Sequence, residues 1–292
     1  MDIRDAFFGE LMRLMHADDR ILLLSVDMGS AVVAKEISKL GTRYLNVGVS
    51  EANAVTVGAA LSARGFRPFI YGISAFLLNR ARAQLRHDVS IGGRCVHLIG
   101  SGPGLTYAED GPSHHCLDDL SLMRSLPFFR TFSPWDAASA AEAARRAAES
   151  RLPTYVRLDK GTGLTPKNPF EPLTASLYLR RIGSKTLTVS TATALKDKAG
   201  KWEDTDSDIL LVFELNNQTV GELAPVLAGY EVVLVDDESF GSSGLYSIAC
   251  EAAAQVSGGP ALCDRSLLQP FIQEKYPREE LRCRYRNGGI GK

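Results

Sequence analysis

The chain has 292 residues, of which 45% are hydrophobic, and its formal net charge is -1. This balance predicts a globular protein with room for two domains and argues against a nucleic-acid partner, which would need a clear excess of basic residues. No apolar run reaches membrane-spanning length, the N-terminus lacks a signal-peptide pattern, and the five cysteines are scattered, so we expect a cytoplasmic protein with reduced thiols and no membrane segment.

Residues 1–160 alternate between strand-like and helical patterns. Strands are predicted over 20–26, 67–71, 95–99, 128–132 and 154–158. Helices are predicted over 3–17, 75–89, 116–125 and 136–149, with further helices after the first strand and behind Glu51. The strands are mostly continuous apolar runs, which is typical of parallel strands buried on both faces. Strand and helix alternating at this spacing indicate a doubly wound α/β domain.

A second, smaller α/β domain is expected after a linker. Three prolines and two glycines fall between residues 160 and 174, and we place the linker at 161–180. The clearest elements beyond it are strands over 208–213 and 231–235, a helix over 245–256 and a charged surface segment over 196–208. The predicted organisation is two doubly wound three-layer α/β domains, residues 1–160 and 181–292.

One predicted helix begins with an acidic residue directly after a short extended run and a glycine turn. Ser50 is a suitable N-cap, and Glu51 lies in the first helical turn, where a negative charge suits the exposed N–H groups. The residues behind Glu51 are small and apolar, so the helix can approach a neighbour closely and the carboxylate could be buried. An acid in a first turn is an ordinary choice at a helix start, so this pattern alone does not define a site.

Three features follow predicted strands at the edge where open α/β sheets bind ligands. They are Asp27, Glu51 and the long loop 100–115. The coincidence strengthens the functional interpretation of Glu51. The glycines and proline of the loop would let its backbone approach a ligand closely, although a solvated surface loop is the equally plausible alternative.

The same loop carries Asp110, His114 and His115, which offer hydrogen-bond acceptors and proton carriers within a few residues. A metal site is not expected, because the consecutive His114, His115 and Cys116 cannot all turn to one ion and no other ligand cluster is present. The motifs of serine hydrolases, P-loop proteins and dinucleotide-binding proteins are also absent.

Two further residues have both a structural and a functional interpretation. Phe76 begins a helical segment, and in isolation a core aromatic residue is the simpler explanation. Arg157 ends an apolar strand, where a guanidinium group is costly unless it meets an anion. A phosphate and an internal carboxylate are equally plausible partners for Arg157.

The order of several segments resembles transketolase, and more closely the C-terminal halves of split, two-chain transketolases. These segments are N-V-G-V-S-E-A-N-A-V (46–55), R-P-F-I-Y (67–71), S-A-F-L-L-N-R-A-R-A-Q-L-R (74–86), E-D-G-P-S-H-H (109–115), L-M-R-S-L-P (122–127) and Y-V-R-L (155–158). The likeness is strong over 4–160 and continues weakly over 232–245. It implies a pyrimidine-binding domain followed by a shortened transketolase C-terminal-like domain.

The resemblance implies thiamine diphosphate and Mg²⁺ as cofactors. Glu51 would be a catalytic and cofactor-binding residue that hydrogen-bonds a ring nitrogen of the aminopyrimidine and so promotes removal of the thiazolium proton. A carboxyl group buried beside an apolar ring can share or donate a proton, which fits this role. Phe76 would lie against the aminopyrimidine, and Asp27 would lie near the cofactor.

The resemblance also implies a substrate site. Asp110, His114 and His115 would bind the hydroxyl groups of a ketose or an aldose, His114 would also be catalytic, and Arg157 would bind a sugar phosphate. The implied reaction moves a two-carbon ketol unit from a ketose to an aldose. Gly102 stands where many transketolases have a histidine, and Arg82 replaces a usual aromatic residue.

The diphosphate and the metal imply a partner. The family holds both with a G-D-G motif followed by an asparagine, in a domain that precedes this one, and G-D-G does not occur in the sequence. We therefore expect activity only with an N-terminal transketolase subunit that carries G-D-G…N, in a heterotetramer of two copies of each chain.

Three other classes of protein are alternatives to a split transketolase subunit. The β subunit of a 2-oxoacid dehydrogenase-type decarboxylase has a similar Glu-bearing domain but lacks E-D-G-P-S-H-H. A single-chain 1-deoxyxylulose-phosphate synthase is not expected, because its N-terminal half has no counterpart here. A non-catalytic paralogue that stabilises a partner would have no need of Glu51.

Overall fold

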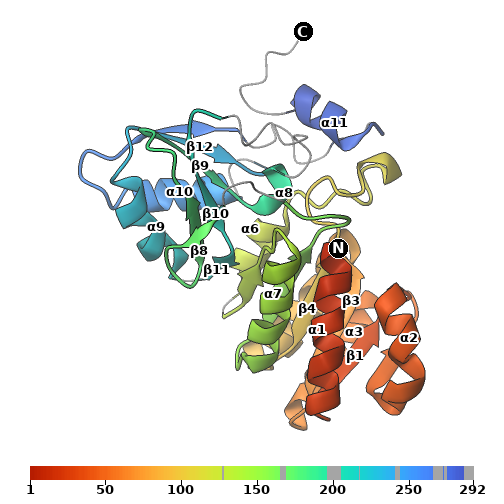
Figure 1. The fold of residues 1–292 in the computed structure, drawn as a ribbon. Coiled ribbons are helices and arrows are strands. Elements are labelled where there is room, and N and C mark those ends of the chain that lie inside the picture. Colours follow the sequence, from red (N-terminus) through yellow and green to blue (C-terminus); the bar gives the residue numbers. More distant parts are fainter. Residues whose placement is uncertain are drawn as a thin grey trace. The chain divides into compact units, whose positions relative to one another are not determined.

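The computed structural model describes residues 1–126, 128–164, 169–195, 205–216, 218–240, 244–265, 272 and 275–285. The chain forms two compact units, drawn in Figure 1. The N-terminal unit comprises Met1–Pro103 and Leu122–Gly163, and the C-terminal unit comprises Gly104–Ser121 and Leu164–Lys292. The predicted division into 1–160, a linker and 181–292 remains a prediction, and the loop 104–121 is the main difference between it and these units.

Within the N-terminal unit, parallel strands lie in the order β5-β6-β4-β3-β1-β2. Their bounds are β1 Ile21–Ser25, β2 Tyr44–Asn46, β3 Arg67–Ile73, β4 His97–Ser101, β5 Arg130–Phe132 and β6 Thr154–Leu158. Every residue of β1, β4 and β6 is buried. Apolar side chains predominate in β1, as is typical of a parallel strand that is covered on both faces.

The helices of this unit lie on both faces of the sheet. They are α1 Ile3–Ala17, α2 Ala31–Leu40, α3 Glu51–Ala63, α4 Ser74–Arg80, α5 Arg82–Gln84, a π-helical segment Leu85–Ile91 and α7 Ala137–Glu149. On β3, Tyr71 packs against Phe8 of α1, with ring centroids 4.7 Å apart. The neighbouring Ile70 meets α3, since a Cβ on Gly58 would lie 2.8 Å from Ile70 Cδ1. Because adjacent residues of a strand face opposite ways, α1 and α3 cover opposite faces, and the predicted three-layer α/β fold is confirmed.

Some local details differ from the sequence-based expectations. The helix predicted over 75–89 is broken near Ala81 and ends in the π-helical segment. The helix predicted over 116–125 is shorter, at α6 Asp119–Arg124. Ser50 precedes α3 but its hydroxyl does not cap the helix, because Ser50 Oγ donates to the Val47 carbonyl oxygen at 2.9 Å.

The C-terminal unit is built on a mixed sheet with the strand order β13-β12-β9-β10-β8-β7. Its strands are β7 Glu171–Pro172, β8 Leu177–Arg180, β9 Thr186–Ser190, β10 Asp208–Val212, β12 Val232–Asp236 and β13 Ala261–Asp264. Strands β9, β10, β12 and β13 are parallel, whereas β8 is antiparallel to β10, and β7 to β8. The other elements of the unit are the short strand β11 Glu214–Leu215, the 3₁₀ turn η3 Ala108–Asp110 and the helices α8 Ala192–Leu195, α9 Thr219–Leu227, α10 Leu245–Ala253 and α11 Arg278–Tyr285.

The core of this unit lies between the sheet and helices α9 and α10, and includes Leu210, Val233 and Ile248. Strands β7 and β8 fall inside the interval predicted as a linker, because Leu177 and Leu179 are buried in that core. Most of the predicted charged segment, residues 196–204, lies outside the described residues.

The structure also bears on membrane-spanning helices and on the cysteines. Among the described residues, no helix is long and apolar enough to cross a membrane. The five cysteines are all free thiols, with Cys116 buried and Cys263 and Cys283 exposed.

Candidate active site

The order of the strands defines where a ligand can enter the N-terminal sheet. The chain runs from β1 to β2 on one side and then returns to place β3 on the other side of β1. Ligands bind at such a switch point, outside the carboxyl ends of the strands. Asp27 follows β1, Glu51 opens the helix after β2, and Phe76 lies on the helix after β3. The three predicted cofactor residues therefore follow three adjacent strands.

Glu51 is the first residue of α3 and is only 5% exposed. Gly48 adopts a positive φ of 73° before it, which lets the chain turn from β2 into α3. The helix behind Glu51 has Ala54, Val55 and Gly58 on its buried side. Small side chains here allow α3 to lie close to the sheet, and this brings the Glu51 carboxylate into the interior.

An arginine that the sequence did not single out connects Glu51 to Phe76. The Arg80 guanidinium donates from Nη1 to both carboxylate oxygens of Glu51, at 3.2 and 3.4 Å. The Arg80 Cζ atom also lies 4.3 Å from the centroid of the Phe76 ring, as a cation–π contact. One guanidinium thus spans the acid and the aromatic ring, which must lie close together.

Arg82, which replaces an aromatic residue usual in transketolases, lies two residues after Arg80. Arg82 donates to Ser125 Oγ at 2.5 Å, whereas Arg80 makes the contacts to Glu51 and Phe76. The signal for Arg80 was its spacing, because residues four apart on a helix lie on the same side. Arg80 lies four residues after Phe76 on α4.

Asp27 bonds to Asn46, at the start of the turn that leads from β2 to Glu51. It has a positive φ of 54° and an exposed side chain. Its backbone N–H donates to Asn46 Oδ1, and its Oδ1 accepts from Asn46 Nδ2, both at 3.2 Å. Asn46 Oδ1 also accepts from the Gly48 N–H at 3.0 Å. Asp27 therefore helps to fix the turn that leads to Glu51, while its exposed carboxylate retains acceptor capacity.

The loop with the E-D-G-P-S-H-H motif belongs to the C-terminal unit. Gly104 and Cys116 pair across its base through two backbone hydrogen bonds of 2.9 Å. Asp110, in the middle of the loop, is exposed. His114 is half-buried, with Nδ1 3.0 Å from Ser113 Oγ. The loop is a closed, ordered structure that presents Asp110 at its surface.

His115 differs from its neighbour His114 in its surroundings. It is 9% exposed, and its Nε2 lies 3.1 Å from the Ala108 carbonyl oxygen. Burial lowers the pKa of His115 below its usual value, so the imidazole is neutral at pH 7 and Nε2 donates to Ala108. These contacts hold the loop together, and its role in substrate binding stays a prediction.

Arg157 is 1% exposed, near the end of β6. Its register partner on β4 is Gly100, where a Cβ would lie 2.5 Å from Tyr155 and 2.6 Å from Ser74. A guanidinium this deeply buried requires anionic or hydrogen-bonding partners, whether from the protein or from a ligand. Both roles predicted for Arg157 are compatible with this burial.

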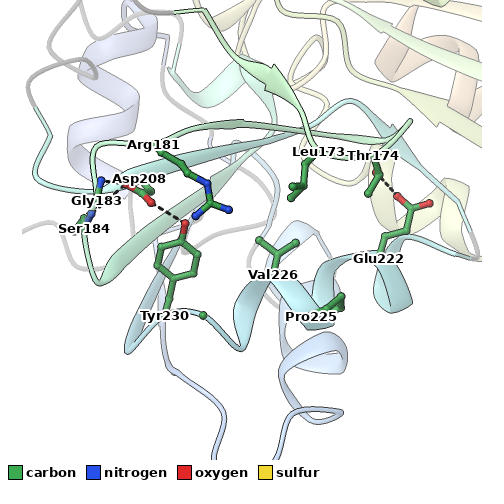
Figure 2. A pocket seen from close by; sticks show the side chains of 11 residues that line it. Leu173, Thr174, Arg181, Gly183, Ser184, Asp208, Glu222, Pro225, Val226 and Tyr230 are labelled. Carbon is green, nitrogen blue, oxygen red and sulfur yellow. Dashed lines mark hydrogen bonds between the residues drawn. The ribbon is translucent and has the colours of Figure 1, made fainter.

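The C-terminal unit also has an open pocket of about 540 Å³, lined by residues that follow β8, by Asp208 at the start of β10 and by residues of α9. Figure 2 shows Arg181 directed into it above the apolar Val226. The acids that line the pocket are already bonded, since Asp208 accepts from Tyr230 at 2.7 Å and from three backbone N–H groups. Among the lining residues, Arg181 is the one basic side chain. Glu222 accepts from Thr174 Oγ1 at 2.6 Å, so both lining acids take part in hydrogen bonds within the unit.

Within the described part of the chain, no group of three or more His, Cys, Asp or Glu side chains could hold a metal ion. The buried Glu51 beside Phe76 does suit one end of a flat, polar, nitrogen-containing ring. The fold and this site define a transketolase-type pyrimidine-binding protein.

Comparison with known proteins supports this class and identifies the family. Residues 1–164 match the family described as "Transketolase, pyrimidine binding domain", so the chain belongs to that family. The "6-deoxy-6-sulfo-D-fructose transketolase subunit SqwH" of Clostridium sp. (strain MSTE9) is 34% identical over 157 residues, which cover 53% of this chain and 49% of that protein. A "1-deoxy-D-xylulose-5-phosphate synthase" of Oleidesulfovibrio alaskensis is 33% identical over 161 residues, 55% of this chain and 25% of the synthase.

Two solved structures resemble this chain over most of its length. A structure described as "Split gene transketolase, inactive beta4 tetramer" matches with a TM-score of 0.74 and 25% identity, over 94% of this chain and 91% of the other. Transketolase from Campylobacter jejuni matches with a TM-score of 0.62 and 20% identity, over 82% of this chain and 40% of that one, and shows the fold alone. The chain spans about half of the first curated relative and a quarter of the synthase.

Proposed function

We propose that this chain is the pyrimidine-binding subunit of a thiamine-diphosphate-dependent transketolase that transfers a two-carbon ketol unit from a ketose to an aldose. The observation that carries the proposal is the buried Glu51 carboxylate beside the Phe76 ring at the switch point of the sheet. The split transketolase neighbour, alike over nearly all of both chains, supports the assignment. When bound, thiamine diphosphate supplies the group that accepts and passes on the two-carbon unit.

The role of Glu51 is to hold a proton at a ring nitrogen of the aminopyrimidine. Its burial is suited to this task, because a hydrogen bond from a buried carboxyl group to a ring nitrogen does not compete with water. Phe76 provides an apolar face for the ring. Asp27, with an exposed carboxylate beside the Glu51 turn, is proposed to lie near the cofactor.

Substrate binding is proposed for four residues of the chain. Asp110 and His114 are proposed to bind sugar hydroxyls, with His114 also moving a proton, and His115 to support them from within the loop. Arg157 is proposed to bind a phosphate on the sugar. The ordered loop would keep Asp110 and His114 oriented before the substrate arrives.

The proposed enzyme requires a second chain. The diphosphate of the cofactor needs Mg²⁺ with oxygen ligands, and the G-D-G motif that provides them in this family does not occur in the sequence. The partner would be an N-terminal transketolase subunit with G-D-G…N, in a heterotetramer located in the cytoplasm. The similar split-gene transketolase structure is that of an inactive β4 tetramer, which supports the proposal of a second kind of chain.

The pair between Arg80 and Glu51 favours a second candidate function. A carboxylate that remains bonded to a guanidinium cannot serve a pyrimidine ring, and a chain in which it never leaves would be a non-catalytic stabilising subunit. The two candidates make opposite predictions for the Glu51→Gln variant: a catalytic subunit would lose transfer activity, whereas a stabilising subunit would leave it unchanged.

The test uses the chain mixed with a partner that carries G-D-G…N, thiamine diphosphate and Mg²⁺. Glu51→Gln should lower transfer by at least about 10²–10⁴-fold, since an amide cannot provide the proton. Glu149→Gln, an exposed acid at the end of α7, should retain wild-type transfer. Equal activity of the Glu51 variant and the wild type, with all components saturating, would exclude the proposed role.

The need for the partner is tested in the same system by calorimetry. The chain alone should bind thiamine diphosphate and Mg²⁺ weakly or not at all, and the second chain should restore binding and transfer together. Tight binding and turnover by the single chain would overturn the two-chain part of the proposal.

A further inference from the structure

Glu238 is a buried acid at the carboxyl end of β12 that contacts the motif loop. It is 1% exposed, and its Oε2 accepts from the Leu105 backbone N–H at 3.0 Å. The adjacent Gly104 lies so close that a Cβ there would be 2.5 Å from the same oxygen. The base of the loop thus rests directly on the Glu238 carboxylate.

Two arginines of α11 bind the same carboxylate. Arg278 donates from Nε to Oε1 at 2.9 Å and from Nη2 to Oε2 at 2.7 Å, and Arg282 Nε lies 3.4 Å from Oε1. Arg278 Nη2 also donates to the Thr193 carbonyl oxygen at 3.0 Å, and Arg282 donates to that of Ala194. Glu238 therefore connects the loop, α8 and α11 within one unit.

Apolar and backbone contacts reinforce this connection. The loop and the α11 region share a small cluster made of Leu105, Ala108, Leu117, Ile272 and Leu281. The Phe240 N–H, two residues after Glu238, donates to the Leu117 carbonyl oxygen at 2.8 Å. Both ends of the loop are thereby attached to the segment that follows β12.

We propose that Glu238 is a positioning residue for substrate binding: its carboxylate, held by Arg278 and Arg282, fixes the loop that carries Asp110 and His114. This inference rests on the proposed function of that loop, and it assigns a task to the C-terminal unit. The physical reason is that a buried carboxylate with two cationic partners allows one geometry, whereas a neutral side chain would leave buried donors unpaired.

Amide hydrogen exchange of the full chain tests the positioning without any enzyme activity. In Glu238→Gln, the Leu105 amide should exchange about ten- to a hundredfold faster, as expected for losing a hydrogen bond to a charged acceptor. Glu231→Gln is the matched control, because Glu231 pairs with Lys185 at the surface of the same unit. The control should leave the exchange of residues 104–118 unchanged.

Kinetics in the two-chain enzyme provide the second readout. Glu238→Gln should raise the KM for the sugar about tenfold, the factor that corresponds to one weakened oriented contact, while cofactor affinity and kcat stay at the wild-type values. Arg278→Lys keeps the positive charge but loses the fork geometry. It should give intermediate exchange and KM values, and it serves as the test if Glu238→Gln fails to fold.

Two results would overturn the proposal: unchanged exchange at Leu105, or faster exchange spread uniformly over the C-terminal unit with kcat and KM falling together. If the wild-type mixture shows no transfer at all, the proposed function fails, whereas the exchange result on the chain alone still decides whether Glu238 fixes the loop.

Discussion

Replacing Arg80 with methionine tests whether this arginine occupies the N-terminal site before a cofactor binds. Arg80 occupies the two groups that the proposed function gives to the aminopyrimidine, the Glu51 carboxylate and the Phe76 ring. If both contacts must break before the cofactor enters, then Arg80 competes with it. Arg80→Met should therefore strengthen cofactor binding.

The size of the effect follows from the exposure of Arg80. Its side chain is 51% exposed, so its ion pair with Glu51 contributes only about 0.2–1 kcal/mol. The cation–π contact at such a site contributes about 0.5–1 kcal/mol. Together these terms correspond to a Kd for thiamine diphosphate about three- to thirtyfold lower in Arg80→Met.

Calorimetric titration of thiamine diphosphate with Mg²⁺ into the two-chain mixture measures this change. Arg82→Met is the matched control, since Arg82 is two residues further on and donates to Ser125 instead. Weaker cofactor binding by Arg80→Met would refute the competition and show that the guanidinium forms part of the occupied site. A lower unfolding temperature of the variant is expected as well, because Glu51 would lose its partner in a buried position.

Two further predictions concern other buried groups. Arg157→Ala should raise the KM for phosphorylated sugars about ten- to a hundredfold more than that for free sugars; an equal effect on both would indicate an internal ion pair, and Arg157→Lys controls for folding. Burial lowers the pKa of His97 from 6.5 to about 3, so below pH 6.5 the unfolded chain binds a proton that the folded chain excludes. Stability in urea should therefore fall by about 2 kcal/mol between pH 7 and pH 5 through this residue, and His97→Gln should remove that part of the pH dependence.

The N-terminal strands could be predicted because their physical signal is local. Apolar residues predominate in the runs that form β1 and β6, since both faces of each strand are covered. The same local reasoning located Glu51 at the start of α3. Asp27 and Glu51 then followed from one rule, that ligands bind beyond the carboxyl ends of parallel strands, whereas the role of Phe76 was implied by the resemblance to transketolase.

The features that the sequence did not predict depend on distant partners. Strand β9 alternates apolar residues with Thr188 and Ser190, which are buried only because hydroxyl and carbonyl partners from elsewhere meet them. Helix α11 is rich in charged residues, and Arg282 is buried because it forms an ion pair with the buried Glu238. Nothing local in the sequence indicates that Arg80 reaches Glu51, the acid of another helix.

The chain passes between its two units three times, after Pro103, after Ser121 and after Gly163. A fragment that ends near residue 164, where the family match stops, would keep the loop 104–121. It would lose Glu238 and helix α11, which hold that loop. Leu105, Leu117 and Leu120 would then lose their covering side chains, and such exposed apolar groups favour aggregation. Expression of the N-terminal part by itself therefore calls for a short bridge in place of residues 104–121, and not for a simple truncation.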